Sequence, residues 1–285
     1  MVVFAFTDAQ EGLIPVVRSV FKYTTLSLIS LVWLLPVYLL LVNAITPASS
    51  YEGTAAWVPE GFGIFENISA AWEHADLGAS LLSSVLYSVG SAFVAVVLAA
   101  LAAFAVVVMP VKRPSMWFWV IYSGTLLPLQ IFLPPLFRAY NELRIYDTQI
   151  GLLLIYTAIC IPFAYFLLRN YLTTVAQEIA EAAQLDGASW FRIFFQVHLP
   201  IIRSSLLAAF IFQFTWVWND LLFGLTLSTS PEIRPVMAAL AQLTGGLYNV
   251  GPPVALAAAL VVSIPTVVLF LNAQRFFASS LKPIE

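Results

Sequence analysis

Long apolar runs without charge are the feature that most restricts how this chain can fold. The stretch from Leu77 to Val111 contains no Asp, Glu, Lys or Arg, and neither does the stretch from Tyr23 to Tyr51. About 20 apolar residues are enough for one helix to cross the hydrocarbon core of a bilayer. Charged residues make up 9% of the chain, whereas a typical soluble domain has roughly 25%. The sequence therefore predicts an all-α integral membrane protein.

Six apolar runs, all but the fifth without charge, alternate with loops in which proline, glycine and charged residues gather. Prolines inside several of the runs predict bends, which neighbouring helices in a membrane can accommodate. Short helices are also predicted in two loops, near Ile68–His74 and over Val236–Leu243, the latter as a re-entrant or membrane-surface helix. The predicted spans cover residues 24–46, 81–108, 115–137, 150–168, 204–227 and 254–273, between an N-terminal segment of residues 1–23 and a tail of residues 274–285.

The positions of the basic residues predict how these spans are oriented. Loops on the cytoplasmic side of a membrane carry an excess of Lys and Arg. If both termini are cytoplasmic, the cytoplasmic segments hold nine of the 12 basic residues and the outer loops hold three, so the sequence predicts that both termini are cytoplasmic. The cytoplasmic set is Arg18, Lys22, Lys112, Arg113, Arg169, Arg192, Arg203, Arg275 and Lys282, and the outer set is Arg138, Arg144 and Arg234.

One polar segment interrupts the apolar pattern between the fourth and fifth predicted spans, over residues 174–200. Thr174 and Gln177 have the spacing of a capping box, which predicts a helix that begins there. Gly187 is placed to end that helix in a left-handed conformation. Ser189 is a candidate N-cap for a second short helix rich in aromatic residues. The pattern predicts a compact helix–turn–helix connector that lies on the cytoplasmic side.

This connector resembles the EAA loop of the permease subunits of binding-protein-dependent ABC importers. The residues that carry the resemblance are Glu181-Ala182-Ala183, Gly187, Val197 and Leu199-Pro200, in the order and spacing of that loop. Val197 stands where the family usually has isoleucine. The resemblance implies a cytoplasmic coupling helix that docks on an ATPase subunit.

Further segments resemble the carbohydrate branch of this family, and in particular the smaller permease subunit of maltose-type systems. They are Pro134-Pro135-Leu136-Phe137, Leu143 to Thr148 with Gly151, Trp218-Asn219-Asp220, and Gln274-Arg275-Phe276-Phe277. The tail then departs from the family, since Ala278 to Lys282 replaces the usual glycine-rich and basic continuation. Any contact that the usual tail makes is therefore not expected from this chain.

The resemblance implies a set of partners and a coupling site. Two permease subunits form the pathway for a sugar, two ATPase subunits bind ATP and Mg below them, and an extracytoplasmic solute-binding protein delivers the cargo. The chain is then a multi-pass protein of the cytoplasmic membrane that needs no cofactor of its own. The residues implied in ATPase coupling are Glu178, Glu181, Ala182, Ala183, Asp186, Gly187, Leu199 and Pro200.

Trp218, Asn219 and Asp220 form a second candidate site, in the pathway or at a gate. An ionisable residue at membrane depth is costly and often functional. The other interpretation is structural: Asp220 caps a helix break near the outer surface and bonds to backbone amides. The uncharged residues between Arg203 and Asp220 would span roughly 24 Å as a helix. Because that is most of the ~30 Å core, the structural interpretation is favoured.

Several functions find no support in the residues. None of the three lysines (Lys22, Lys112 and Lys282) completes a phosphate-binding loop, so the chain is not expected to hydrolyse ATP or to be an enzyme. Its two histidines and single cysteine do not suggest a metal site, and a net charge of −3 does not suggest nucleic-acid binding. Two alternatives stay open: an ABC permease for glycerol phosphate, a polyol or another organic solute, and a stand-alone secondary transporter. Few buried charges and no paired broken-helix repeat speak against the second.

Overall fold

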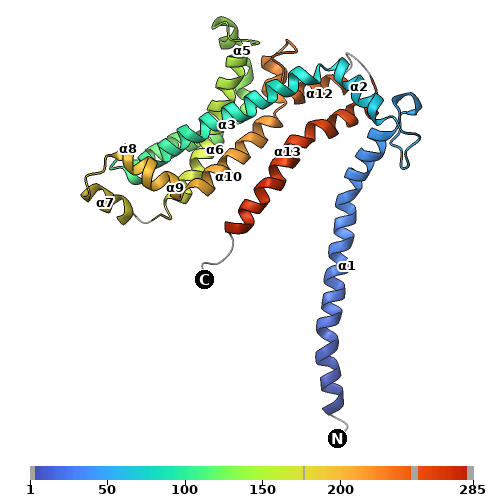
Figure 1. Ribbon diagram of the computed structural model, residues 1–285, viewed down its shortest axis with the longest axis horizontal. Coiled ribbons are helices and arrows are strands. Elements are labelled where there is room, and N and C mark those ends of the chain that lie inside the picture. Colours follow the sequence, from blue (N-terminus) through green and yellow to red (C-terminus); the bar gives the residue numbers. More distant parts are fainter. Residues whose placement is uncertain (1–3, 176, 245–249, 281–285) are drawn as a thin grey trace. The chain divides into compact units, whose positions relative to one another are not determined.

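The computed structural model describes residues 4–175, 177–244 and 250–280 of the chain (Figure 1). These residues form helices and connecting turns, and none of them lies in a β-strand. The chain divides into two units, which are described separately. The first comprises Met1–Ala70 and Val250–Leu260, and the second comprises Ala71–Asn249 and Val261–Glu285.

The described helices follow the predicted apolar runs, with some differences at their ends. Helix α1 begins well before the first predicted span, and α6 continues past the fourth. The α-helices are α1 (Phe4–Ile45), α2 (Ile64–His74), α3 (Leu77–Val108), α4 (Pro114–Tyr122), α5 (Leu133–Glu142), α6 (Gln149–Leu172), α7 (Glu178–Leu185), α8 (Trp190–Arg192), α9 (Leu199–Ile201), α10 (Arg203–Trp218), α11 (Leu222–Leu227), α12 (Val236–Thr244) and α13 (Pro252–Ser280).

In the first unit, asparagine side chains tie the end of α1 to the loop that follows it. The Asn43 side chain donates to the carbonyl of Ala56 and accepts from its N–H. The buried Asn67 of α2 donates to the carbonyls of Ala44 and Thr46, each at 2.9 Å. The bonds from Asn67 satisfy carbonyl groups that the end of α1 leaves without an intrahelical partner.

The second unit is built on α3, which packs against α6 and α10. The buried face of α3 consists mainly of small side chains, which allow neighbouring helices to approach closely where no water drives their association. A second contact links the start of α3 to the segment before α12, because the Tyr87 hydroxyl donates to the carbonyl of Ile233 at 2.8 Å. The small buried residues of α3 include Ser80, Ser84, Ser88, Ser91, Ala92, Ala95, Ala99 and Ala103.

Two of the predicted spans are broken rather than straight. The third is divided into α4 with the 3₁₀ turn η2 (Ser123–Thr125), and the 3₁₀ turn η3 (Leu129–Phe132) with α5, at an angle of 83°. Pro128 explains the break, because a proline has no N–H and disfavours helical conformation in the residue before it. The fifth is interrupted between α10 and α11, at the predicted Trp218-Asn219-Asp220.

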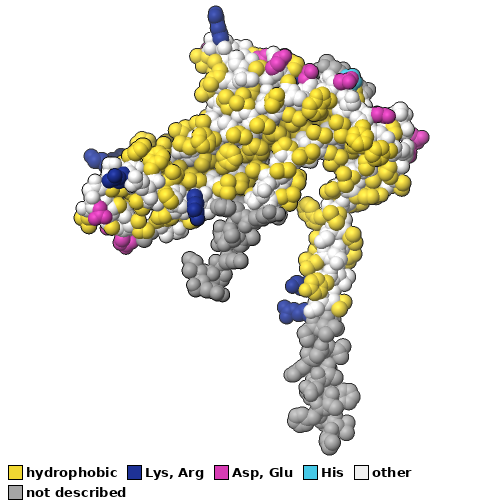
Figure 2. All heavy atoms as spheres, viewed as in Figure 1, with side chains coloured by type: hydrophobic (Ala, Val, Ile, Leu, Met, Phe, Trp, Pro, Cys, Tyr) yellow, Lys and Arg dark blue, Asp and Glu magenta, His cyan; other side chains and the backbone are white. Residues whose placement is uncertain are grey.

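By length and composition, four described helices can cross a membrane: Arg18–Ile45 within α1, α3, α6 and Pro252–Gln274 within α13. The count is up to six if each bent helix pair forms one span. Figure 2 shows hydrophobic side chains along the middle of the second unit, whereas charged side chains gather at the end that contains α7 and α8 and beyond the free end of α5. Such an apolar belt between charged ends is the surface expected of a membrane protein.

Candidate functional site

Helix α7 presents a row of acidic side chains on the surface of the second unit. Glu178, Glu181 and Asp186 are all exposed, and no ion pair or side-chain hydrogen bond to them occurs among the described residues. Glu178 and Glu181 lie in the first turn, where carboxylates are favoured by the helix dipole. Ala180 is 1% exposed and attaches the opposite face of α7 to the bundle.

The turn after α7 has the geometry predicted for it. Gly187 has a φ of +78°, its N–H donates to the carbonyl of Gln184, and the N–H of Ala188 donates to that of Ala183. This is the Schellman arrangement that commonly ends helices. A Cβ atom added to Gly187 would meet no atom within 4 Å. Glycine is therefore required here by the backbone conformation and not by a lack of space.

An aromatic segment follows the turn and anchors it. The Ser189 hydroxyl accepts from the N–H of Arg192, as predicted for an N-cap, and α8 continues into one turn of π-helix, η4 (Ile193–His198). Ile193, Phe194 and His198 are buried. Phe104 of α3 lies against this segment, with its ring centroid 5.2 Å from that of Phe194 and 5.1 Å from that of His198.

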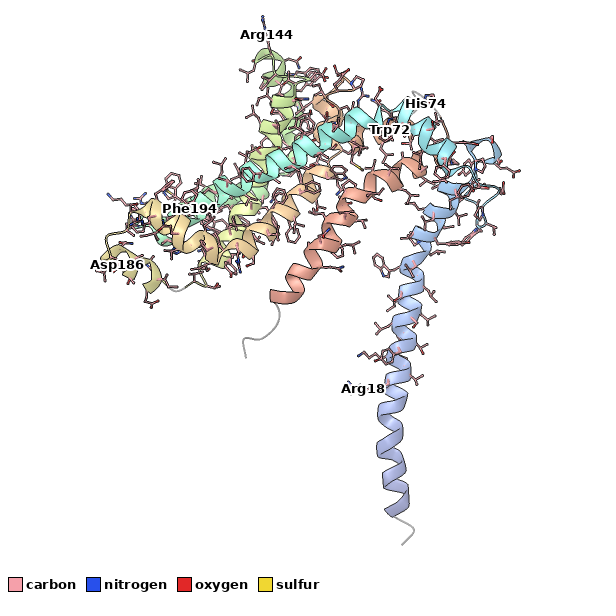
Figure 3. The ribbon with its side chains drawn as sticks, viewed as in Figure 1. Arg18, Trp72, His74, Arg144, Asp186 and Phe194 are labelled. Carbon is pink, nitrogen blue, oxygen red and sulfur yellow. The ribbon has the colours of Figure 1, made fainter. Side chains whose placement is uncertain are left out.

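The remaining predicted coupling residues are brought together on the same connector. Ala182, Gly187 and Pro200 are exposed, while Ala183 and Leu199 are partly buried. Asp186 and Phe194 both lie at this end of the unit, whereas Arg144 lies at the other end, past the start of α6 (Figure 3). The connector is thus firmly attached to the bundle on one side and open on the other.

Two hydrophobic residues of this open surface were not singled out from the sequence. Leu185 is 90% exposed and Phe191 is 72% exposed, on either side of the Gly187 turn. Large exposed apolar side chains next to charged ones mark sites of protein–protein contact. The sequence places Leu185 directly before Asp186, but its apolar side chain alone does not show that it is exposed.

The predicted capping box is wrong. The Thr174 hydroxyl donates to the carbonyl of Tyr171, one turn back, and so makes no cap for α7. Gln177 is itself the N-cap position and makes no capping bond with its side chain. A threonine close to the end of a preceding helix can satisfy its hydroxyl locally, which the spacing alone does not reveal.

At the other end of α10, Asp220 is 8% exposed and its carboxylate is enclosed by donors. Oδ2 accepts from the Tyr156 hydroxyl at 2.8 Å and from the N–H groups of Phe223 and Gly224 at 3.0 and 3.2 Å. The predicted bonds to backbone amides are therefore present. They satisfy the first amides of α11, and Tyr156 joins this helix start to α6.

The neighbours of Asp220 differ from each other in exposure. Trp218 is 1% exposed, and its indole N–H donates to the carbonyl of Val262 in α13 at 3.1 Å. Asn219 is exposed, and its amide donates to the carbonyl of Thr215 at 2.7 Å. Trp218 therefore acts in helix packing, while the Asn219 side chain is exposed.

A further carboxylate, Asp147, joins the loop before α6 to the loop after α11. It accepts from the N–H groups of Thr229 and Ser230 at 2.8 and 3.0 Å and from the Ser230 hydroxyl. Burial alone raises the pKa of the Asp147 carboxyl, but the bonds to Ser230 and Thr229 and the charge of Arg234 together lower this pKa below its ordinary value of 3.8. In the sequence, Asp147 was noted only within Leu143 to Thr148, the segment that resembles the permease family, and no role was predicted for it.

The described residues contain no group of three or more His, Cys, Asp or Glu side chains that could hold a metal ion. The arrangement is suited to binding another protein through an exposed, partly acidic surface.

Comparison with known proteins identifies a family. The model of the family "binding-protein-dependent transport system inner membrane component" matches residues 95–282. The diacetylchitobiose uptake system permease protein of Streptomyces coelicolor is 29% identical over 240 residues, which cover 81% of this chain and 79% of that protein. The sn-glycerol-3-phosphate transport system permease protein of Shigella flexneri is 28% identical over 94% of this chain and 97% of its own. Among solved structures, a bacterial ABC transporter involved in the import of alginate matches with a TM-score of 0.76 and 17% identity, over 92% of this chain and 96% of that one.

Proposed function

This chain belongs to the family of binding-protein-dependent transport system inner membrane components, and from that premise we propose that it is the permease subunit of an ATP-driven importer for a sugar. It is a transport protein and not an enzyme. The proposal extends to its partners: two ATPase subunits, a second permease subunit and an extracytoplasmic solute-binding protein. The family membership also makes a stand-alone secondary transporter the weaker alternative.

The single observation that carries the proposal is the connector of α7–α9. Its outer surface combines exposed carboxylates with the exposed Leu185 and Phe191, and its inner surface is buried against Phe104. A groove on an ATPase subunit with basic and apolar groups would complement the outer surface. The aromatic attachment then gives a path by which a movement of the ATPase reaches α3, α6 and α10. In this proposal Ala182 and Ala183 permit close approach, and Leu199 and Pro200 lead the chain into α10.

The proposed topology has six spans with both termini in the cytoplasm. The excess of basic residues on the proposed inner side supports it. So does the position of Arg144 at the end of α6 away from Asp186 (Figure 3), since the two residues would then lie on opposite sides of the membrane. In this arrangement the bent pair Pro114–Thr125 and Leu129–Glu142 forms the third span, and α10 with α11 forms the fifth. The proposed location is the cytoplasmic membrane.

The cargo is proposed to be a sugar because the relative that takes up diacetylchitobiose matches most of this chain. Glycerol phosphate is the second candidate, since a permease for it matches an even larger share of the chain at similar identity. The two differ in charge. A phosphate-carrying pathway needs basic side chains, whereas a sugar needs hydroxyl partners and apolar ring faces.

The proposed function is tested by isolating the assembly. The chain, tagged at its C-terminus, should purify from its native membrane with an ATPase subunit and a second permease, and the reconstituted assembly should import a labelled sugar only with ATP and the binding protein. Import of glycerol 3-phosphate and of no sugar would show that the cargo is the second candidate. If the chain purifies alone and its transport does not need ATP, the proposal of an ATP-driven importer is wrong.

The topology is tested separately with reporter fusions. A reporter fused after Pro200 or at the C-terminus should report the cytoplasm, and one inserted near Glu60 should report the outside, because the basic residues favour that orientation. The reverse pattern would put the connector on the wrong side for an ATPase.

A further inference from the structure

A cavity of about 560 Å³ lies at the end of the second unit that carries the connector. Its walls come from the last turn of α3, the start of α4, the end of α6 and the residues that lead into α7. Binding sites for small molecules commonly measure about 300–1,000 Å³. The cavity is therefore large enough to hold the polar headgroup of a phospholipid.

Arg169, near the end of α6, gives this cavity a permanent positive charge. Its guanidinium carbon lies 4.9 Å from the centroid of the Phe118 ring, and its Nη1 donates to Oδ1 of Asn170 at 3.3 Å. A guanidinium packed on an aromatic ring is held in place while its remaining N–H groups stay available. No carboxylate forms an ion pair with Arg169 in the described part of the chain, so its charge is available to an anion.

The other walls combine hydrogen-bond donors with apolar surface. The Ser115 side chain lines the cavity, and its N–H belongs to the first turn of α4, where N–H groups have no intrahelical acceptor. Val106, Val107 and Val108 line the cavity from α3. Glu178 also lines it, and the charge of its carboxylate opposes the binding of an anion. This combination suits a ligand that has a single negative charge next to an apolar part.

The surroundings of the cavity have the composition of the headgroup layer of a membrane. Lys112 and Arg113 are exposed on the turn just before α4, and Figure 2 shows basic side chains at this end of the unit. Trp117 and Trp119, in the first two turns of α4, are 44% and 59% exposed. Tryptophan gathers where a membrane meets water, and basic pockets between spans on the cytoplasmic side bind the headgroups of anionic lipids.

We propose that this cavity binds the phosphate of an anionic phospholipid from the inner leaflet, and that the bound lipid strengthens coupling. Arg169 and the first turn of α4 hold the phosphate, and the apolar part of the lipid lies against the valines of α3. Thr173, Thr174 and Glu178 belong to the same walls, so a bound headgroup ties the start of the connector to α4 and α6. The site rests on the proposed importer with its connector in the cytoplasm and adds a regulator to it.

Lipid titration of the purified importer tests the binding site. Dioctanoyl phosphatidylglycerol should raise the melting temperature of the importer in neutral detergent more than dioctanoyl phosphatidylcholine does. Arg169→Gln should weaken the apparent affinity for phosphatidylglycerol about five- to tenfold, and Arg169→Lys should restore part of it. Glu178→Gln should strengthen it, because a repelling charge is removed. The matched control is Arg192→Gln, an exposed basic residue of the same end that does not line the cavity, and its affinity should stay unchanged.

Cysteine labelling locates the lipid without depending on stability. Cys160 is 1% exposed, so a hydrophilic maleimide should label only an introduced cysteine of this chain. Phosphatidylglycerol should slow the labelling of Ser115→Cys and leave that of Met116→Cys unchanged. Met116 is 45% exposed and does not line the cavity. Slowing of both, or of neither, would show that the lipid does not occupy the cavity.

Activity in vesicles tests the regulatory part. Replacing part of the phosphatidylcholine by phosphatidylglycerol should raise the ATP hydrolysis that loaded binding protein stimulates, and Arg169→Gln should lose most of this response while Arg192→Gln keeps it. An equal response in wild type and Arg169→Gln would overturn the proposed regulation.

The remaining outcomes separate the possible errors. If inorganic phosphate protects Ser115→Cys as well as phosphatidylglycerol does, the ligand is a soluble anion and the lipid site is overturned. If phosphatidylglycerol acts on Arg169→Gln as on the wild type while the wild type imports sugar, the lipid site is wrong and the proposed function stands. If the chain purifies without an ATPase, the proposed function and the regulation fail together, and labelling of Ser115→Cys in the isolated chain still decides whether the lipid binds.

Discussion

The carboxylates near the two ends of α10 differ in exposure and in hydrogen bonding. Glu178, Glu181 and Asp186 lie on the connector of α7–α9, before α10. All three are exposed, and none forms an ion pair or a side-chain hydrogen bond with another described residue. After α10, Asp220 is buried and accepts three hydrogen bonds. A helix of this length separates the two ends by roughly 24 Å at 1.5 Å per residue.

This difference indicates which end of α10 is available to bind a partner protein. A buried carboxylate is tolerated only when hydrogen-bond donors surround it. The donors around Asp220 belong to α6 and α11, so its hydrogen bonds hold α6, α10 and α11 together. The exposed carboxylates make no ion pair or side-chain hydrogen bond among the described residues, so we expect a charge reversal there to leave the fold intact. We therefore expect changes before α10 to act on coupling and changes after it to act on stability.

The largest expected effect comes from Glu181→Lys and Gly187→Val. The first reverses a charge on the docking surface, where a charge-assisted contact is worth about 1.5–3 kcal/mol, or roughly ten- to hundredfold in affinity for the ATPase. The second places a β-branched residue at a φ of +78°, which strains the turn. Sugar uptake and stimulated ATP hydrolysis should fall sharply, while the amount in the membrane stays near normal.

The matched control is Gln184→Ala, an exposed position of the same helix that carries no charge. It should transport almost normally. Normal coupling in Glu181→Lys together with failure of Gln184→Ala would mean that a different face of α7 meets the ATPase.

A smaller effect, on stability, is expected from Asp220→Ala. The substitution leaves the Tyr156 hydroxyl and the N–H groups of Phe223 and Gly224 without their acceptor. Leaving a buried polar group unsatisfied costs roughly 1–3 kcal/mol. The purified importer should therefore melt at a lower temperature, while Asn219→Ala at the exposed neighbouring position should change it little. Unchanged stability with lost transport would show that Asp220 acts in the pathway instead.

The smallest effect is a dependence of stability on acid through Asp147. Its pKa is lowered in the folded protein, so the carboxylate contributes stability above its ordinary pKa of 3.8, and this is lost as the pH falls through the lowered value. Asp147→Asn should abolish that part of the pH dependence, so it should lower stability at neutral pH and matter little below the lowered pKa. Thermal denaturation of both forms across acidic pH measures it. An unchanged acid profile in the variant would refute the role of Asp147.

The sequence predicted the features that local chemistry determines. Uncharged apolar runs predicted the long helices, Pro128 and Trp218-Asn219-Asp220 predicted the breaks, and Gly187 predicted the left-handed turn. The connector was located by the same reasoning together with a resemblance.

Contacts between distant segments were not predictable in this way. Nothing in the spacing around Phe104 shows that its ring lies against Phe194 and His198, since about 90 residues separate them in the sequence. The bonds from Thr229 and Ser230 to Asp147 depend in the same way on how loops meet. The capping box was wrong because Thr174 found a partner in the helix before it.

The central claim is that the exposed face of the connector meets the ATPase, and cross-linking tests it most directly. Leu185→Cys and Leu143→Cys place a cysteine at two exposed leucines, one on the connector and one at the far end of α6. In membranes that contain the whole importer, a short reagent that joins a thiol to an amine should link Leu185→Cys to a lysine of the ATPase subunit and should not link Leu143→Cys to it. Cross-linking of Leu143→Cys to the ATPase, with none at Leu185→Cys, would contradict the account.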